Sequence, residues 1–285
     1  MKPIALLRRQ LLETLLSFEN PLEAKAMADR LVEFFTGRDG VSICLHPETE
    51  VSDEVERRLI AAVRELEQGM PLQYLLSEAW FYGNAYEVNA HTLIPRPETE
   101  ELVQWALQDL PASFSGKGVD VCCGTACIGI TMAMQRPQSH WHCVDFFPET
   151  LAVAERNIKR YGVQVSCVRH DVLSDTFLRW GDSDYDLLLC NPPYVMEMER
   201  DSLPVRVKGF EPAAALFVPD NDPLRFYRAV AAWSKGHVRK GGALYFEINE
   251  KLGEETLQLF RAASFSHCEL KKDMQHKDRM LKVTV

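Results

Sequence analysis

The stretch DYDLLLCNPPYV, Asp184 to Val195, indicates how the larger part of this chain folds. Its centre, Leu187 to Cys190, is a short apolar run that is typical of a strand buried on both faces, as in parallel sheets covered by helices. The run ends in Asn191-Pro192-Pro193-Tyr194, which combines a side-chain amide and an aromatic ring with two residues that cannot donate a backbone hydrogen bond. A simple turn is the plainest interpretation of Asn-Pro-Pro, and the rest of the sequence decides whether it is sufficient.

Strand-like and helix-like segments alternate on both sides of this stretch, from Glu98 to the last residue. The alternation predicts an α/β fold, a doubly wound and mostly parallel sheet of seven strands with helices on both faces. The last two strands are too close together for a helical crossover, so they should pair antiparallel. The predicted strands are 118–122, 140–145, 165–169, 185–190, 243–248, 268–272 and 280–285. The predicted helices are 98–110, 128–135, 148–161, 224–234 and 254–263.

The first 75 residues have a different pattern, which predicts helices only. Ile4, Leu7, Leu11 and Leu15 follow one another at spacings of three and four, so they fall on one face of a helix. Between this part and the alternating part, residues 79–88 carry aromatic residues on both sides of Gly83-Asn84, which predicts a β-hairpin. We therefore expect a helical N-terminal domain (1–75), a hairpin linker (76–97) and an α/β domain (98–285).

Composition excludes several classes of protein. The formal net charge of the 285 residues is −9, so a broad basic surface for duplex DNA or long RNA is not expected. The eight cysteines form no Cys-x-x-Cys pair, and several lie in apolar strand-like runs, where free cysteine behaves as a small hydrophobic residue. We expect neither a metal site nor a disulfide framework, and a cytoplasmic location. No apolar run approaches the length of a membrane span, so no membrane association is expected.

Acidic residues and a loop of small residues occur where successive predicted strands end. Cys122-Cys123-Gly124-Thr125-Ala126 follows the first strand and leads directly into a helix, whose N-terminal N–H groups are free to bind a ligand. Asp145 ends the second strand and could accept both ribose hydroxyl hydrogens. Asp171-Val172 follows the third strand, and Asp171 could accept from an adenine amino group. A helix cap is the alternative for either acid alone, but the set at one sheet edge indicates an adenosine-bearing cofactor.

The Asn191-Pro192-Pro193-Tyr194 motif suits chemistry on a planar NH2 group. The nitrogen of an amide or aromatic amine is a poor nucleophile because its lone pair is delocalised. Asn191 Oδ1 and the Pro192 carbonyl could accept both hydrogens of such a group and hold it in front of a sulfonium methyl group. The two prolines keep these acceptors rigid, and Tyr194 could stack on the substrate and stabilise nearby positive charge. Catalysis would then depend on positioning and electrostatics, without a strong base.

The chain resembles the release-factor glutamine N5-methyltransferases, the HemK/PrmC family, along essentially its whole length. The matching stretches are PLQYLLSEAWFYGNAYEVN (71–89), TLIPRPETEELV (92–103), NPPYV (191–195), GFEPAAALF (209–217) and KDRML (277–281). The resemblance implies a helical domain for substrate recognition and a catalytic domain dependent on S-adenosylmethionine. It also implies that the substrate is the Gln of the Gly-Gly-Gln loop in peptide-chain release factors. We expect a monomer that does not bind nucleic acid directly.

The resemblance also assigns site residues. Asn191 to Tyr194 would bind the substrate Gln, with Asn191, Pro192 and Tyr194 acting in catalysis. The cofactor would be held by Cys122, Cys123, Gly124, Thr125, Ala126, Asp145, Asp171, Val172 and Asn191.

The cofactor loop departs from the family pattern, which has glycine at three positions that here hold Cys122, Gly124 and Ala126. We expect Cys122 and Ala126 to adopt φ values that are open to residues with a Cβ atom, so that the cofactor still binds. Two alternatives remain. An adenine-N6 methyltransferase would use a similar motif, but the acidic composition argues against nucleic acid as substrate. A relative that docks a release factor without methylating it is supported by the altered loop alone.

Overall fold

The computed structural model describes residues 1–265 and 267–285, which form two compact units. The smaller unit comprises Met1–Ser77 together with Val205–Phe210, and the larger unit comprises Glu78–Pro204 and Glu211–Val285. The hairpin that we predicted as a linker is thus grouped with the larger unit. A short segment from the second half of the chain is grouped with the smaller one.

The smaller unit is helical and packs the predicted apolar stripe into its core. Ile4, Leu7, Leu11 and Leu15 are all buried. Arg206 forms an ion pair with Glu19 at 2.6 Å, which connects the 205–210 segment to this unit. The helices are α1 (Ile4–Leu15), α2 (Pro21–Thr36), α3 (Gly40–Leu45), α4 (Asp53–Glu67), α5 (Leu72–Leu76) and α9 (Val205–Lys208). The expectation of helices only is wrong in one detail, because β1 (Lys2–Pro3) and β2 (Glu50–Val51) form a short antiparallel pair.

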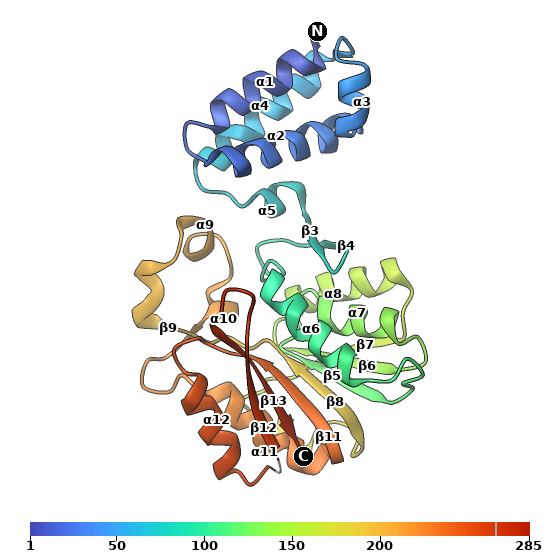
Figure 1. Cartoon of the computed structure of the whole chain (residues 1–285), viewed down its shortest axis with the longest axis vertical. Helices are drawn as coiled ribbons and strands as arrows, with labels where there is room; N and C mark the ends of the chain where they lie inside the picture. Colours follow the sequence, from blue (N-terminus) through green and yellow to red (C-terminus); the bar gives the residue numbers. More distant parts are fainter. Residues whose placement is uncertain (266) are drawn as a thin grey trace. The chain divides into compact units, whose positions relative to one another are not determined.

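The larger unit contains the predicted seven-stranded sheet, in the order β12-β13-β11-β8-β5-β6-β7 (Figure 1). Strands β11, β8, β5, β6 and β7 are parallel, and β13 lies antiparallel between β11 and β12, so the predicted antiparallel final strand is confirmed. The chain order reverses at β5, whose neighbours are β8 and β6. The strands are β5 (Lys117–Val121), β6 (His140–Asp145), β7 (Val165–Arg169), β8 (Tyr185–Cys190), β11 (Val238–Glu247), β12 (His267–Lys272) and β13 (Asp278–Thr284).

Strand β11 begins five residues before the predicted strand. Val238 pairs with Tyr185, and regular pairing resumes only at Ala243 opposite Leu187, after a shift in register. The irregular residues between these two points, 239–242, hide the strand pattern in the sequence.

Helices cover both faces of the sheet, as the doubly wound prediction requires (Figure 1). One face is covered by α6 (Pro97–Asp109), α7 (Cys127–Gln135) and α8 (Pro148–Tyr161), and the other by α11 (Arg225–His237) and α12 (Gly253–Ala262). The central strand β8 is packed between the two layers, and Leu187 to Cys190 are at most 1% exposed. The apolar run Leu187 to Cys190 is therefore a strand buried on both faces, as predicted.

The predicted hairpin consists of β3 (Glu78–Phe81) and β4 (Asn84–Glu87). Its turn lies one residue earlier than we expected, at Tyr82-Gly83. These two residues have φ values of 50° and 75°, as a two-residue type I′ turn requires, and Asn84 already belongs to β4.

The connection between β8 and α11 contains short elements that the sequence did not predict. They are β9 (Val195–Met196), the 3-10 helix η2 (Glu197–Ser202), α10 (Ala213–Leu216) and β10 (Phe217–Val218), besides α9. Strands β9 and β10 form a short parallel pair, which brings the start of α10 back beside the end of β8.

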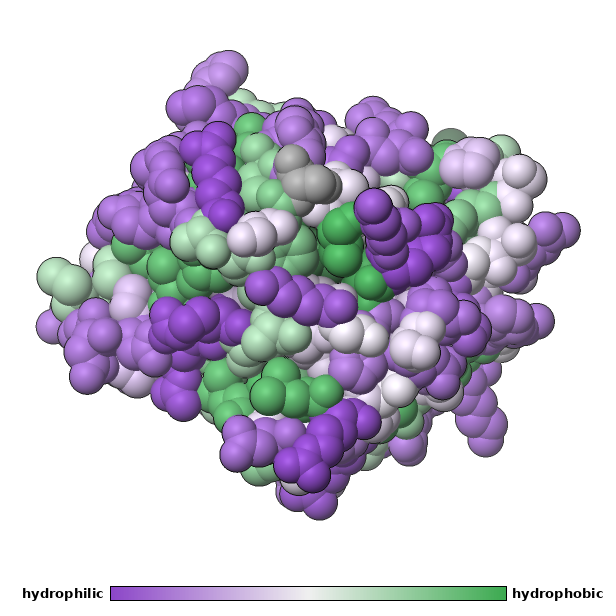
Figure 2. Space-filling model, turned by 90° about the horizontal axis from the view of Figure 1, so that it is seen from below, coloured by the Kyte–Doolittle hydropathy of each residue, from purple (hydrophilic) through white to green (hydrophobic). Residues whose placement is uncertain are grey.

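Figure 2 shows one face of the molecule, on which hydrophilic side chains predominate and hydrophobic atoms appear in separate patches between them. Such a distribution is normal for a surface in contact with water. Among residues 1–265 and 267–285, no helix is both long and apolar enough to span a membrane.

Candidate active site

A cavity of about 510 Å³ lies at the carboxyl ends of the parallel strands, within the larger unit. This is the edge at which open α/β sheets bind ligands, and the reversal of strand order at β5 marks the position. Seven of the predicted site residues line the cavity: Cys122, Gly124, Asp145, Asp171, Val172, Asn191 and Pro193. The other five, Cys123, Thr125, Ala126, Pro192 and Tyr194, do not belong to its walls.

The loop after β5 has a backbone that the sequence reasoning did not anticipate. Cys122, Gly124 and Ala126 have φ values of 60°, 56° and 62°. All three lie in the left-handed region, so the expectation that Cys122 and Ala126 avoid it is wrong. A residue with a Cβ atom there is destabilised by roughly 1–2 kcal/mol relative to the right-handed region. The loop thus keeps the conformation that glycine favours, with non-glycine residues at two of the three positions.

Buried polar groups hold this loop in place. Asn157 of α8 is fully buried, and its Nδ2 donates to the Thr125 carbonyl at 3.1 Å and to the Glu87 carbonyl at 3.1 Å. Asn157 Oδ1 accepts from the Glu87 N–H at 2.8 Å. The same side chain therefore ties the cofactor loop to the hairpin strand β4. No local pattern around Asn157 indicates this role.

Beneath the loop, Asp120 of β5 is completely buried. Its Oδ2 accepts from the Gly129 N–H at 3.0 Å, whereas its Oδ1 has no partner among the described residues. Burial raises the pKa of Asp120 to about 7. The carboxyl thus carries a desolvation penalty whenever it is ionised.

Acidic side chains give the cavity its electrostatic character. Asp145, Glu149 and Asp171 line it, and no Lys or Arg does so among the residues that the structure describes. Asp145 accepts backbone hydrogen bonds from Gly124 (3.0 Å), Phe146 (2.8 Å) and Phe147 (3.3 Å), so it caps its own turn while it faces the cavity. Desolvation nevertheless raises the pKa of Asp145.

These walls fit a ligand with hydroxyl donors and a positive charge. Asp171 Oδ1 accepts from the Leu173 N–H at 2.9 Å, and the rest of the carboxylate stays available to a donor in the cavity. A phosphate-bearing cofactor would meet three carboxylates without a compensating cation, whereas S-adenosylmethionine offers ribose hydroxyls and a cationic sulfur. This set of acceptors therefore fits S-adenosylmethionine.

The amide of Asn191 is held in one orientation. Its Nδ2 donates to Thr99 Oγ1 at 3.0 Å and to Glu247 Oε2 at 3.0 Å, so the NH2 end of the amide faces these two side chains. Asn191 is also part of the cavity wall. Its Oδ1 is thus the atom left to accept a hydrogen bond from a bound group, as the motif predicted.

Tyr194 is held by contacts away from the cavity. Its hydroxyl donates to Glu247 Oε1 at 2.7 Å, and its carbonyl accepts from Asn249 Nδ2 at 3.1 Å. The stacking on substrate that we predicted for its ring stays a prediction.

Glu247 and Thr99 are site residues that sequence reasoning missed. Glu247 is the last residue of β11 and is 1% exposed, and Thr99 in the first turn of α6 is 3% exposed. Burial raises the pKa of Glu247, while its hydrogen bonds and the charge of Arg279 oppose that rise. A carboxylate inside the apolar run Ala243 to Ile248 was the available signal, because such a residue needs partners.

Three further segments of the cavity wall were also missed as site residues. They are His91-Thr92-Leu93 before α6, Phe146-Phe147 before α8, and Pro212 to Ala215 at the start of α10. Thr92-Leu93 lies in the TLIPRPETEELV stretch and Pro212 to Ala215 in the GFEPAAALF stretch, so their placement explains part of the sequence resemblance.

Comparison with known proteins agrees with this geometry. Residues 10–76 match the PrmC N-terminal domain, and residues 102–215 match the methyltransferase small domain. The crystal structure of a methyltransferase from Pyrococcus furiosus has a similar fold, with a TM-score of 0.50 and 13% identity over 82% of this chain and 98% of that one.

Two curated relatives align over nearly the whole chain. The release factor glutamine methyltransferase of Bacteroides thetaiotaomicron is 34% identical over 261 residues, 92% of each chain. That of Flavobacterium psychrophilum is 33% identical over 279 residues, 97% of each chain. With both halves of the sequence matched and the cavity at the expected strand ends, this chain belongs to the release factor glutamine methyltransferase family.

Proposed function

We propose that this protein transfers a methyl group from S-adenosylmethionine to the side-chain amide nitrogen (N5) of the Gln in the Gly-Gly-Gln loop of peptide-chain release factors. The observation that carries the proposal is the orientation of Asn191, whose amide Nδ2 donates to Thr99 and Glu247. A side chain fixed in this way is an acceptor, and an acceptor is what a substrate NH2 group needs. Membership of the family supports the same substrate.

Cofactor binding is assigned to the loop 122–126, Asp145, Asp171-Val172 and Asn191. When bound, S-adenosylmethionine supplies a methyl group on a cationic sulfur, an electrophile strong enough for a weakly nucleophilic amide. Asp145 is the acceptor for the ribose hydroxyls, and Asp171 is the acceptor for the adenine amino group. The acidic cavity wall favours a ligand that carries a positive charge.

The chain's own residues orient the substrate amide. Asn191 Oδ1 accepts one hydrogen of the NH2 group, and the Pro192 carbonyl accepts the other. Pro192 and Pro193, both buried, restrict the backbone that carries these acceptors. Tyr194 contributes its ring to substrate binding. As the methyl group leaves sulfur for nitrogen, positive charge develops on the nitrogen and the fixed dipole of Asn191 stabilises it. The methylated, protonated amide then loses its proton readily to water, so that a strong base is not required.

Recognition of the release factor is assigned to the helical part of the chain, residues 1–75, and the protein is proposed to act as a cytoplasmic monomer that does not bind nucleic acid directly. The net charge of −9 and the acidic cavity are unfavourable for an adenine-N6 methyltransferase on nucleic acid.

The test is incubation of the purified protein with S-adenosylmethionine and a purified release factor, followed by mass spectrometry of the Gly-Gly-Gln peptide. The expected result is a single added methyl group on Gln. If S-adenosylmethionine binds in isothermal titration but no peptide gains mass, the proposed activity is wrong. If the folded protein does not bind S-adenosylmethionine either, the non-catalytic release-factor-binding alternative takes its place.

Two substitutions at Asn191 test the assigned orientation. Asn191→Ala removes the acceptor and should lower kcat by about 10²–10³-fold, the usual loss for one preorganised hydrogen-bonding group. Asn191→Asp keeps an oxygen of similar reach beside a developing positive charge, although a second carboxylate next to Glu247 is unfavourable. We expect the Asp variant to retain clearly more activity than the Ala variant, while both stay folded and still bind S-adenosylmethionine. Equal activity of Asn191→Ala and wild type would mean that Asn191 only shapes a turn.

A further inference from the structure

Three side chains meet at Glu247, one from α6 and two from the Asn191–Tyr194 motif. The residue before it, Phe246, pairs with Cys190, so Glu247 lies opposite Asn191 at the end of the neighbouring strand. Glu247 Oε2 accepts from Thr99 Oγ1 at 2.5 Å and from Asn191 Nδ2 at 3.0 Å, and Oε1 accepts from the Tyr194 hydroxyl at 2.7 Å. All three neighbours donate, which is the pattern expected around an ionised carboxylate.

The same contacts exclude the flipped amide of Asn191. In a flipped side chain, Oδ1 would lie near 3.0 Å from the Glu247 carboxylate, so two acceptors would face each other. Thr99 Oγ1 has one hydrogen, which it already donates to Glu247, so it could not donate to the flipped oxygen either. Glu247 and Thr99 together thus select the orientation in which Nδ2 faces the protein.

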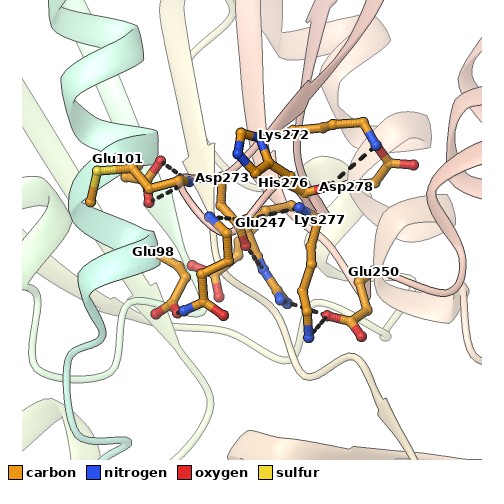
Figure 3. A network of polar contacts seen from close by, with 12 residues as sticks. Glu98, Glu101, Glu247, Glu250, Lys272, Asp273, His276, Lys277 and Asp278 are labelled. Atoms are coloured by element: carbon orange, nitrogen blue, oxygen red, sulfur yellow. Dashed lines mark hydrogen bonds and ion pairs between the residues drawn. The ribbon is translucent and has the colours of Figure 1, made fainter.

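The start of α6, which carries Thr99, is held by contacts of the residues that flank it. Figure 3 shows the turn between β12 and β13 beside the first turns of α6, with Glu98 and Glu101 directed toward it. Glu101 accepts from the Met274 N–H at 3.2 Å, and Glu98 accepts from Gln275 Nε2 at 3.5 Å. Because Thr99 lies between these two glutamates in the sequence, the turn holds the start of the helix that presents its hydroxyl.

The turn is rigid in its own right. Asp273 accepts from the Gln275 N–H at 2.9 Å and from the Lys277 N–H at 3.0 Å, and its other oxygen accepts from Arg279 Nε at 3.0 Å. Arg279 Nη2 also donates to Glu250 at 3.0 Å. The KDRML stretch therefore contributes to the support of α6 as well as to the sheet.

We propose that Glu247 is a positioning residue for methyl transfer, which fixes Asn191 as an acceptor through its direct contact and through Thr99. The proposal rests on the function proposed above, because Asn191 must contact the substrate amide for its orientation to matter. Glu247 lies behind Asn191 and does not belong to the cavity wall, so it acts through Asn191. Its negative charge also polarises the Asn191 amide and strengthens the acceptor that faces the substrate.

The test is a double-mutant cycle with Glu247→Gln, Asn191→Ala and the double variant. Single-turnover rates are measured with the protein in excess over the release factor and S-adenosylmethionine saturating. Glu247→Gln keeps the shape and one acceptor but loses the charge, so the rate should fall by about tenfold. Asn191→Ala should lower it by about 10²–10³-fold. If Glu247 acts through Asn191, the double variant should lie within about twofold of Asn191→Ala.

A matched control removes a carboxylate from another tyrosine in the same sheet. Asp109 Oδ2 accepts from the Tyr245 hydroxyl at 2.6 Å and from Lys282 at 2.6 Å, and it does not line the cavity. Asp109→Asn should leave the rate unchanged, even where it lowers thermal stability. Titration should give the wild-type affinity for S-adenosylmethionine in Glu247→Gln and Asp109→Asn, and should show that the variants with Asn191→Ala still bind it.

Two results would overturn the proposal: a wild-type rate in Glu247→Gln, or a double variant about tenfold slower than Asn191→Ala, which would mean independent effects. If the wild-type protein does not methylate the release factor, both the proposed function and the positioning role of Glu247 are wrong. If the wild-type protein is active and the rate losses of the two single variants multiply in the double variant, only the positioning role is wrong.

Thr99 provides a second pair of variants for the case in which Glu247→Gln does not fold. Thr99→Val removes the hydroxyl with little change of shape, and Thr99→Ser keeps it. We expect Thr99→Ser to retain the wild-type rate, whereas Thr99→Val should lose about tenfold and show the same non-additivity with Asn191→Ala. Equal rates for the Val and Ser variants would contradict the positioning role.

Discussion

Asn157→Ala should destabilise the larger unit more than any surface substitution on the same hairpin. Asn157 makes three hydrogen bonds while fully buried, and all three go to backbone groups of β4 and the cofactor loop. Removal of the side chain leaves the Glu87 N–H, the Glu87 carbonyl and the Thr125 carbonyl without these partners. A bond of this kind contributes about 0.5–1.5 kcal/mol net, so the three together contribute roughly 1.5–4.5 kcal/mol. We expect a loss of about 3 kcal/mol in the free energy of unfolding.

Urea denaturation followed by tryptophan fluorescence measures this loss in the right part of the chain. All five tryptophans, Trp80, Trp105, Trp141, Trp180 and Trp233, lie in the larger unit, so the signal reports on its unfolding. Asn84→Ala is the matched control, because Asn84 makes one side-chain bond, to the Tyr82 carbonyl at 2.9 Å, and should cost no more than about 1 kcal/mol. A loss in Asn157→Ala no larger than in Asn84→Ala would refute the reasoning and mean that water replaces the Asn157 amide.

Three further outcomes are expected. The pKa of Asp120 is raised from 3.8 to about 7, so its stabilising contribution is complete below about pH 4 and is lost as the pH rises through 7. The Tm of Asp120→Asn should therefore rise relative to that of wild type as the pH increases to about 7. A difference in Tm that does not depend on pH would contradict this. Asp145→Ala should weaken S-adenosylmethionine binding by at least about tenfold in isothermal titration, since hydrogen bonds to a charged group contribute about 1.5–3 kcal/mol each. Unchanged affinity would mean that Asp145 only caps its own turn. Ala126→Gly should unfold within about 1 kcal/mol of wild type, whereas Ala126→Val should lose clearly more, because a β-branched residue is disfavoured at positive φ.

The fold was predictable because hydrophobic burial imposes clear periods on the sequence. Leu187 to Cys190 read as a doubly buried strand because every side chain in the run is apolar, and each is at most 1% exposed. The 195–218 connection was not predictable, since its helices and strands are too short to show a period. The strand start at Val238 was missed for a related reason, because a break in register interrupts the alternation.

Site residues could be predicted where a short motif suits a single kind of chemistry. They could not be predicted where the role of a residue depends on a partner far away in the sequence. Asn191 was identified from the motif alone, and its free oxygen is the one that the motif required. Glu247 was read as part of a strand, because nothing near it in the sequence shows that Thr99, 148 residues away, would donate to it. Long-range pairs of this kind are fixed by strand order, which cannot be predicted from local sequence patterns.

The cofactor loop shows why the identity of a residue predicts backbone conformation poorly. Ala126 was expected to avoid the left-handed region because alanine has a Cβ atom, yet its φ is 62°. The left-handed conformation costs roughly 1–2 kcal/mol for such a residue. Against this, the buried Ala126 methyl group gains about 0.8 kcal/mol from burial, and alanine restricts the unfolded chain relative to glycine by about 0.4–1 kcal/mol. The opposing effects nearly cancel, so the fold can keep the left-handed loop without glycine at this position, and what the site requires is the conformation of the backbone.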